Sequence, residues 1–311
     1  MNKVAIIGGS GYIGSYITKL FLQNHYLVKV SVRDLSRKDK FKHLMLLPNT
    51  DNLFVSELDI MNQLALEDFI DDCDILIHCG TPFQLDVETP SQVETPTVSG
   101  TKNFLNCLLH HSTLKKVVVV ASVAALNTNF PFPVPNYPES HVYSELDKPY
   151  YNEECPPYAR AKFNANVEVT NFLKEHRSLN FELTSVSPVF VIGKPLSDRE
   201  DSTSVNLLYY FKNNIAGSAF IKLLYETNIN MAVVDVQDVA MSIFKTATTL
   251  GTHGKNYLLS SESWKVSDIK LMLNKKVTEG GPSIVYSSDL IQKDLGLFFK
   301  SARTSLHHFS N

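Results

Sequence analysis

Three residues near the middle of the chain have side chains suited to proton transfer at a carbonyl group. Tyr158 and Lys162 are four residues apart, a spacing that places both on one face of a helix. A nearby ammonium favours phenolate, so Lys162 is expected to lower the pKa of Tyr158 toward the range useful for proton transfer. Ser122 follows the apolar run Val117–Ala121, and its hydroxyl can stabilise negative charge that develops on a carbonyl oxygen. The alternatives are an ordinary amphipathic helix for the Tyr–Lys pair and a strand-capping role for Ser122.

A glycine-rich turn near the N-terminus predicts a dinucleotide site. The sequence Gly-Gly-Ser-Gly-Tyr-Ile-Gly at positions 8–14 follows an apolar strand and opens an amphipathic helix. Gly8 and Gly11 permit a tight turn close to a pyrophosphate, and Gly14 lets the helix pack on the strand. The start of the helix then faces the phosphates. The alternative is a glycine-rich turn with a structural role only.

The end of the second strand indicates which nicotinamide cofactor is bound. An acid at this place accepts from the ribose hydroxyls, whereas an arginine pairs with a 2′-phosphate. Arg33 stands there, and further basic residues follow at Arg37, Lys38, Lys40 and Lys42. Guanidinium groups bind phosphate through charge-assisted bonds, so NADP(H) is favoured. A solvated basic surface is the alternative for most of these residues, and Asp34 could still contact a ribose.

Two further segments lie where strands are expected to end at the cofactor. Asp59 follows the third strand and is placed to bond an adenine amino group. Cys79-Gly80-Thr81-Pro82 follows the fourth strand and would pass beneath the cofactor ribose. Ordinary turns are the competing interpretation of both segments.

The elements that must position these residues alternate between strand-length apolar runs and amphipathic stretches. This alternation predicts a parallel sheet with helices on both faces, which is a Rossmann-type, doubly wound α/β fold. Runs such as Ile75–His78 and Val117–Ala121 are almost entirely apolar, as expected of strands buried on both faces. The expected elements are Lys3–Ile7, Tyr12–Asn24, Leu27–Val32, Arg37–Leu47, Leu53–Ser56, Leu64–Asp71, Ile75–His78, Pro90–His111, Val117–Ala121, Pro157–His176 and Glu182–Ser187.

The second part of the chain predicts a smaller lobe. Residues 127–138 are rich in proline and aromatic residues, which excludes a regular helix or central strand and indicates a loop over a site. Helices are expected at Val205–Asn214, Val236–Thr248, Lys265–Leu273 and Arg303–Phe309. Residues 1–190 are predicted to form a nucleotide-binding domain with the catalytic group, joined by some later segments. Residues 191–311 would form mainly a substrate-binding lobe.

Composition excludes several classes of partner. The 311 residues carry 29 basic and 32 acidic side chains, so no global field would attract nucleic acid or an anionic membrane. The four cysteines show no zinc-ligand spacing, and no apolar stretch is long enough to cross a bilayer. The histidines also lack a recognised metal spacing. We expect a soluble cytoplasmic protein, monomeric or homodimeric, that binds a small molecule and no metal.

The chain resembles the extended short-chain dehydrogenases/reductases, and within them the dihydroflavonol reductase and cinnamoyl-CoA reductase group. The resemblance covers nearly the whole length. Besides the glycine-rich turn and the Tyr158/Lys162 pair, it rests on Val32–Asp34, Phe41–Leu44, Leu47-Pro48, His78–Pro82, Pro96–Thr101, Val117–Ser122, Ser187–Gly193, Val234–Ala240 and Asp294–Gly296.

The resemblance implies an NADPH-dependent reduction of a ketone or aldehyde, with Tyr158 protonating the oxygen, Ser122 polarising the carbonyl and Lys162 also holding the nicotinamide ribose. The implied cofactor-binding residues are Gly8, Ser10, Gly11, Tyr12, Ile13, Gly14, Arg33, Lys40, Asp59, Ile60, Cys79, Gly80, Thr81, Tyr158, Lys162, Pro188, Val189 and Ser204. The aromatic residues Phe83, Phe130 and Phe132 indicate an apolar or aromatic substrate, with ordinary packing as the alternative. Two positions depart from the family pattern: Ser99 replaces an Asn, and Ala121 replaces a hydroxyl residue. Neither removes a proton-transfer group.

Two other functions remain open. A 3β-hydroxysteroid dehydrogenase or a sugar-nucleotide epimerase would share the scaffold, but both typically use NAD with an acidic residue where Arg33 stands. A non-catalytic NADP-sensing regulator would have a broken catalytic set. Ser122, Tyr158 and Lys162 are all present, which favours a reductase.

Overall fold

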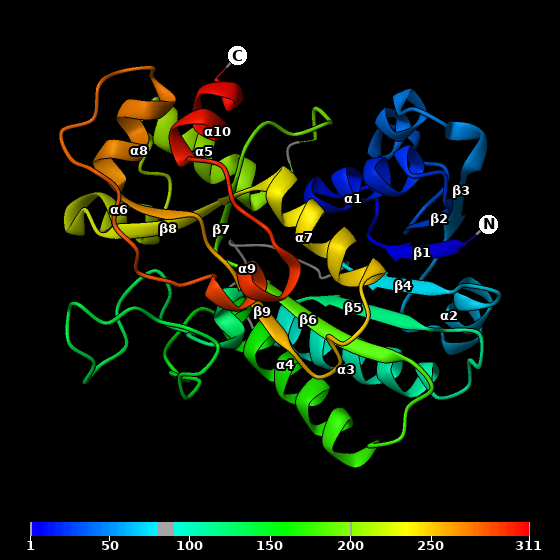
Figure 1. Ribbon diagram of the computed structural model, residues 1–311. Coiled ribbons are helices and arrows are strands. Elements are labelled where there is room, and N and C mark those ends of the chain that lie inside the picture. Colours follow the sequence, from blue (N-terminus) through cyan, green and yellow to red (C-terminus); the bar gives the residue numbers. More distant parts are fainter. Residues whose placement is uncertain (1, 80–89, 200, 311) are drawn as a thin grey trace.

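A parallel sheet of seven strands forms the larger part of the molecule (Figure 1). The computed structural model describes residues 2–79, 90–199 and 201–310. All neighbouring strands of this sheet run parallel, in the order β3-β2-β1-β4-β5-β6-β9. The order reverses between β1 and β4, as predicted for a doubly wound fold. The strands are β1 (Lys3–Ile7), β2 (Leu27–Val32), β3 (Leu53–Glu57), β4 (Ile75–His78), β5 (Lys116–Val120), β6 (Glu182–Pro188) and β9 (Asn256–Leu259).

Helices cover both faces of this sheet (Figure 1). On one face lie α1 (Tyr12–Gln23) and α7 (Val236–Thr248), and on the other lie α2 (Gln63–Ile70), α3 (Pro90–Leu108) and α4 (Pro157–Glu175). The side chains of β1 alternate between the two layers. Val4 and Ile6 pack with α1 and α7, whereas Ala5 and Ile7 pack with the second set of helices. The nearly continuous apolar strands are therefore buried on both faces.

A smaller sheet and its helices lie beside the large one (Figure 1). The sheet has the order β10-β8-β7, with β7 (Phe190–Ile192) parallel and β10 (Glu262–Lys265) antiparallel to β8 (Asn230–Asp235). Phe211 and Trp264 belong to its own apolar core. The helices of this part are α5 (Thr203–Asn213), α6 (Ala219–Thr227), α8 (Val266–Leu273) and α10 (Ala302–Phe309), whereas α9 (Asp289–Leu295) packs with α7 and β9. Three elements of the second part of the chain, α7, α9 and β9, belong to the large layer, and the boundary near residue 190 stays a prediction.

The prediction of one continuous helix at Arg37–Leu47 is wrong. It forms two short 3₁₀ turns, Lys38–Lys40 and Lys42–Leu46, on either side of Phe41. Phe41 and Leu44 are buried, whereas Leu46 is 87% exposed. With His43 these are three adjacent anchors, and they bury too little of the segment to offset the entropy cost of a continuous helix.

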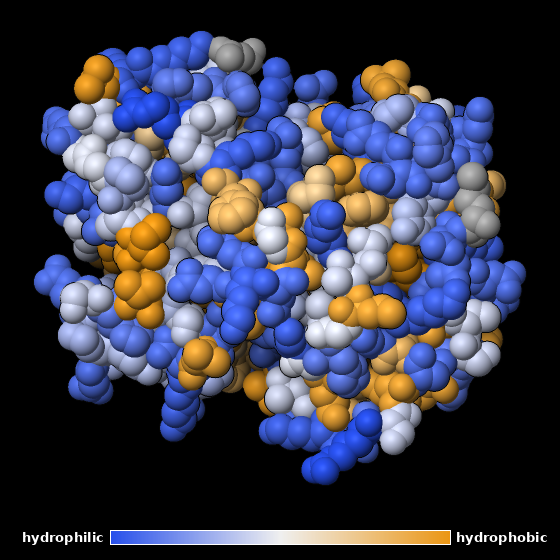
Figure 2. Space-filling model, viewed as in Figure 1, coloured by the Kyte–Doolittle hydropathy of each residue, from blue (hydrophilic) through white to orange (hydrophobic). Residues whose placement is uncertain are grey.

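The surface is mixed in character. Figure 2 shows a mostly hydrophilic face on which apolar side chains occur in small separate groups. In the parts of the chain that the structure describes, no helix combines the length and the apolar character needed to cross a membrane.

Candidate active site

The glycine-rich turn between β1 and α1 forms a close backbone bend. Gly8 has a φ of 78°, in the left-handed region that favours glycine, and the Gly11 N–H donates to its carbonyl at 3.0 Å. A Cβ on Gly14 would lie 2.2 Å from the Gly8 oxygen, so no side chain fits there. The bend precedes the first turn of α1, whose N–H groups are directed toward the carboxyl edge of the sheet. This geometry fits the predicted pyrophosphate of a dinucleotide.

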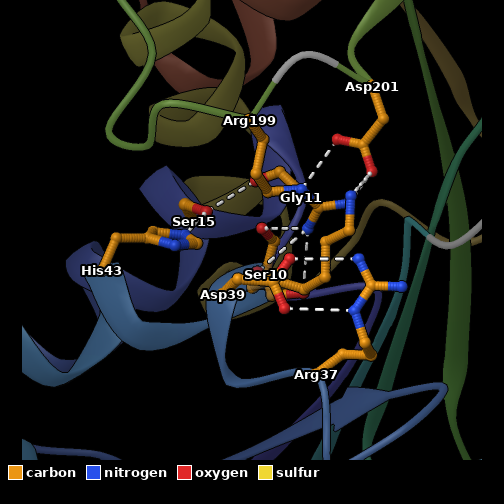
Figure 3. Close-up of polar contacts among 9 residues, drawn as sticks. Ser10, Gly11, Ser15, Arg37, Asp39, His43, Arg199 and Asp201 are labelled. Carbon is orange, nitrogen blue, oxygen red and sulfur yellow. Dashed lines mark hydrogen bonds and ion pairs between the residues drawn. The ribbon is translucent and has the colours of Figure 1, made fainter.

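Side chains from neighbouring elements fix this turn. The Gly8 N–H donates to Ser31 Oγ at 3.0 Å. Ser15 Oγ donates to the Gly11 carbonyl at 2.6 Å and lies 2.8 Å from His43 Nε2 (Figure 3). Burial lowers the pKa of His43, which favours its neutral form. The shape of the turn is therefore set before any ligand contacts it.

Two tyrosines of α1 connect this turn to the segment after β7. Tyr12 donates from its hydroxyl to the Gly193 carbonyl at 2.6 Å, and Tyr16 to the Lys194 carbonyl at 2.7 Å. Burial raises the pKa of Tyr12 well above its ordinary value and that of Tyr16 to about 12, so both remain hydrogen-bond donors. The glycine-rich turn and the start of the smaller lobe are thus joined directly.

The basic residues after β2 have different surroundings. Arg33 directly follows the strand and is exposed. Arg37 is exposed and pairs with Asp39 at 3.1 Å, in agreement with a solvated surface. Lys40 is partly buried and pairs with Asp201 at 3.0 Å. Asp34 accepts from the Ser36 N–H at 2.8 Å and so closes its own turn.

Ser122, Tyr158 and Lys162 come together at the carboxyl edge of the sheet. Ser122 lies just beyond β5, where its Oγ accepts from the Ala124 N–H at 3.2 Å and also hydrogen-bonds Tyr158. Tyr158 lies in the first turn of α4, and Lys162 follows one turn later. The Lys162 ammonium donates to the Val120 carbonyl at 3.3 Å. The proximity expected from the sequence is therefore present.

The pKa values at this site differ from the expectation. Burial raises the pKa of Tyr158 well above its ordinary value, and the hydrogen bond with Ser122 opposes this only in part. The Lys162 ammonium donates to the Val120 carbonyl, and a lowering of the Tyr158 pKa by Lys162 stays a prediction. Burial also lowers the pKa of Lys162 to about 8. Tyr158 is thus a protonated phenol across the physiological range, which suits a proton donor.

Cys79, just after β4, also lies at the carboxyl edge of the sheet, near Lys162. Cys79 Sγ donates to the Ile7 carbonyl at 3.1 Å, and burial raises the pKa of this thiol to about 12. Cys79 also interacts electrostatically with Lys162. The predicted site residues Gly80, Thr81 and Phe83 lie outside the described residues.

Comparison with known proteins decides the family. Residues 4–259 match the NAD dependent epimerase/dehydratase family. The chain belongs to this family. Its sequence is 27% identical to cinnamoyl-CoA reductase CAD2 of Medicago truncatula over 257 residues, 81% of this chain and 75% of that protein. It is 25% identical to an anthocyanidin reductase of Vitis vinifera over 318 residues, 96% of this chain and 91% of that protein.

The solved structures agree on the fold. The yeast methylglyoxal/isovaleraldehyde reductase Gre2, solved with NADPH, superposes with a TM-score of 0.81 at 21% identity, covering 99% of this chain and 97% of that one. The predicted fold class, the resemblance to the reductase group and the general expectation of an oxidoreductase are confirmed.

The other residues predicted to contact the family's cofactor occupy the same region or its borders. Asp59 is exposed and accepts from the Met61 N–H at 2.9 Å, which is a turn, and Ile60 packs on the apolar layer. Pro188 ends β6, next to β5, and Val189 is buried beyond it. Ser204 lies in the first turn of α5. Their contacts with a cofactor stay predictions.

The two described aromatic residues predicted to meet the substrate are partly buried. Phe130 packs against both the large core and the core of the smaller lobe, and its ring lies 5.7 Å from that of Tyr286. Phe132 packs against the smaller core. Both are thus held in place by packing, and a role in substrate binding stays a prediction.

Sequence reasoning missed two charged residues beside the glycine-rich turn. Arg199 donates to the Ser10 carbonyl at 2.9 Å and to the Lys40 carbonyl at 3.2 Å. Its guanidinium also pairs with Asp201 at 2.7 Å. No spacing rule connects residues this far apart in sequence, and the run of charged residues at positions 198–201 is a signal that could have drawn attention to them.

The buried His78 gives a prediction for stability against pH. Burial lowers its pKa to about 3, whereas an unfolded histidine has a pKa of about 6.5. Between these values the unfolded chain binds more protons, so the free energy of unfolding falls as the pH decreases. The His78→Leu variant lacks this titrating group. Its free energy of unfolding, measured relative to that of wild type, should therefore rise by about 2 kcal/mol when the pH is lowered from about 7 to about 5. Urea unfolding at both pH values measures this change. The exposed His308→Leu is the control, and an equal gain there would contradict the assignment to burial.

Proposed function

We propose that this protein is an NADPH-dependent reductase that converts a ketone or aldehyde to an alcohol. The observation that carries the proposal is the hydrogen bond between Ser122 and Tyr158 beside the buried Lys162, at the carboxyl edge of the sheet. The reductases among its relatives and the NADPH in a solved neighbour support it. All four cysteines are free thiols, which is typical of the reducing cytoplasm, where we place the activity.

The proposed roles follow from the protonation states. NADPH, when bound, supplies the hydride that the carbonyl carbon receives. Tyr158, a phenol across the physiological range, donates its proton to the carbonyl oxygen. Ser122 polarises that oxygen and afterwards stabilises the phenolate that remains. Lys162 adds positive charge near the phenolate when protonated and can also hold the nicotinamide ribose.

The smaller lobe would supply the substrate contacts. Phe130 packs against both cores and Phe132 against the smaller one, so packing holds the two rings in place and they can present an apolar surface to a substrate. We propose an apolar or aromatic carbonyl compound as the substrate, with residues 191–311 forming most of its site and residues 1–190 binding the cofactor.

Arg33 is proposed to select NADPH through the 2′-phosphate. Hydrogen bonds between charged groups contribute about 1.5–3 kcal/mol, so Arg33→Asp should weaken NADPH binding about 10- to 100-fold and leave NADH much less affected. Fluorescence titration of both cofactors measures this. Arg37→Asp makes the same charge change on the same loop and is the matched control, because Arg37 pairs with Asp39. Unchanged NADPH preference in Arg33→Asp would exclude Arg33 as the selector.

The activity itself is tested by oxidation of NADPH, and separately of NADH, with a panel of aromatic and aliphatic aldehydes and ketones. We expect turnover with NADPH, faster with aryl carbonyls than with small polar sugars. Tight NADPH binding without turnover across the panel would instead support a cofactor-sensing regulator.

A further inference from the structure

A carboxylate lies between two cations at the predicted phosphate site. Asp201 Oδ2 accepts from Lys40 Nζ at 3.0 Å and from Arg199 Nη2 at 2.7 Å, and its Oδ1 accepts from Arg199 Nε at 2.8 Å. Figure 3 shows Arg199 and Asp201 extending from the segment before α5 toward the glycine-rich turn and the loop after β2. One carboxylate thus holds a planar guanidinium and an ammonium at once.

Arg199 also contacts the backbone that shapes the cofactor site. Its Nη1 donates to the Ser10 carbonyl at 2.9 Å and to the Lys40 carbonyl at 3.2 Å, with Ser10 Oγ 3.4 Å away. Ser10 is buried in the glycine-rich turn, whereas Lys40 belongs to the loop after β2. Arg199 is therefore next to two residues proposed to bind the cofactor, and its side chain is only 22% exposed.

The charges of this cluster match those of a phosphate site. A carboxylate presents two acceptor oxygens to a guanidinium, as a phosphate does, and both groups bind arginine in a bidentate way. The pKa of Asp201 is held well below its usual range by its hydrogen bonds to Arg199 and Lys40, so the carboxylate is ionised at physiological pH. A phosphate that reached Lys40 would meet this negative charge.

We propose that Arg199 and Asp201 are additional determinants of cofactor specificity, in which the Asp201 carboxylate is exchanged for the adenosine 2′-phosphate when NADPH binds. The inference rests on the proposed function, because it assumes that Lys40 binds that phosphate. Without cofactor, Asp201 holds Lys40 and Arg199 together at the edge of the site. When NADPH binds, both cations form ion pairs with the 2′-phosphate instead of with Asp201. NADH carries no 2′-phosphate and leaves the ion pairs intact, so Asp201 affects only the binding of NADPH.

Substitution of Asp201 tests the exchange. Asp201→Asn removes the competing charge, and NADPH should bind about 5- to 10-fold more tightly, while the dissociation constant of NADH stays nearly unchanged. Arg199→Met should weaken NADPH binding about tenfold and NADH binding by less, because only NADPH loses a phosphate partner in addition to the support that Arg199 gives the glycine-rich turn. Dissociation constants are measured by fluorescence titration of purified protein at low and high salt, and the gain in Asp201→Asn should shrink at high salt.

Asp39→Asn is the matched control, since Asp39 forms an exposed ion pair with Arg37 on the same loop. It removes the same charge without releasing Lys40 and should give little change. In a Lys40→Met background, the gain from Asp201→Asn should be largely lost.

Three results would overturn the inference: unchanged or weaker NADPH binding in Asp201→Asn, an equal shift for NADH, or an equal gain in Asp39→Asn. Wild-type protein that bound no NADPH would instead overturn the proposed function, so the two failures are distinguishable.

Discussion

Tyr158→Phe should lower kcat for carbonyl reduction by about two to four orders of magnitude and leave NADPH affinity nearly unchanged. The substitution removes the only proton that the proposed mechanism delivers to the carbonyl oxygen, but it keeps the ring that fills the site. Tyr158 is partly buried and hydrogen-bonded to Ser122, and it lies in the first turn of a long helix, so the backbone should be undisturbed. Steady-state kinetics with NADPH and NADPH titration separate the two effects.

Tyr257→Phe is the matched control for this experiment. Tyr257 is fully buried, and its hydroxyl donates to Asp294 at 2.9 Å. It takes no part in the proposed site, so its loss should lower stability moderately and leave kcat close to the wild-type value. Full activity in Tyr158→Phe, or an equal loss of kcat in Tyr257→Phe, would exclude Tyr158 as the proton donor.

Gly14→Ala should destabilise the protein, although alanine normally favours a helix over glycine by about 1 kcal/mol. The new methyl group would stand 2.2 Å from the Gly8 carbonyl oxygen and 2.8 Å from the Gly9 Cα, both of them backbone atoms that cannot rotate away. Such overpacking costs about 1–3 kcal/mol or more. Movement of Gly8 to relieve the contact would also distort the turn that receives the pyrophosphate, so NADPH binding should weaken as well.

Denaturant unfolding and NADPH titration measure the two effects of Gly14→Ala. The matched control is Gly281→Ala, since a Cβ on Gly281 meets nothing within 4 Å. That variant should be neutral or slightly more stable, because alanine restricts the unfolded chain. A stable Gly14→Ala protein with normal NADPH affinity would contradict the close approach of α1 to the turn.

Six of the seven strands of the central sheet could be predicted almost residue by residue. The bounds of β1, β2 and β4 agree with the sequence expectation, because short apolar runs between polar turns mark strands buried on both faces. The strands β7, β8, β9 and β10 and the helices α6 and α9 were missed. The run at Asn230–Asp235 is equally apolar, but no regular alternation with helices surrounds it, so its type could not be assigned.

The candidate site was predictable where a local motif carries the chemistry. The glycine-rich turn and the Tyr158/Lys162 spacing are local, and Ser122 follows a strand that the sequence identifies. The contacts of Arg199 and Asp201 are not local, because they depend on how the segment after β7 lies against the glycine-rich turn. The raised pKa of Tyr158 could not be predicted from the sequence, because it depends on how the folded protein removes the phenol from water.

The most direct test of the central claim follows hydride transfer itself. NADPH that carries deuterium at the transferable position is incubated with purified protein and an aryl aldehyde or ketone, and the alcohol is analysed by mass spectrometry. The account predicts one deuterium at the carbinol carbon with wild-type protein and almost none with Tyr158→Phe at equal reaction times. Tight NADPH binding with no deuterated alcohol from any carbonyl compound tested would contradict it.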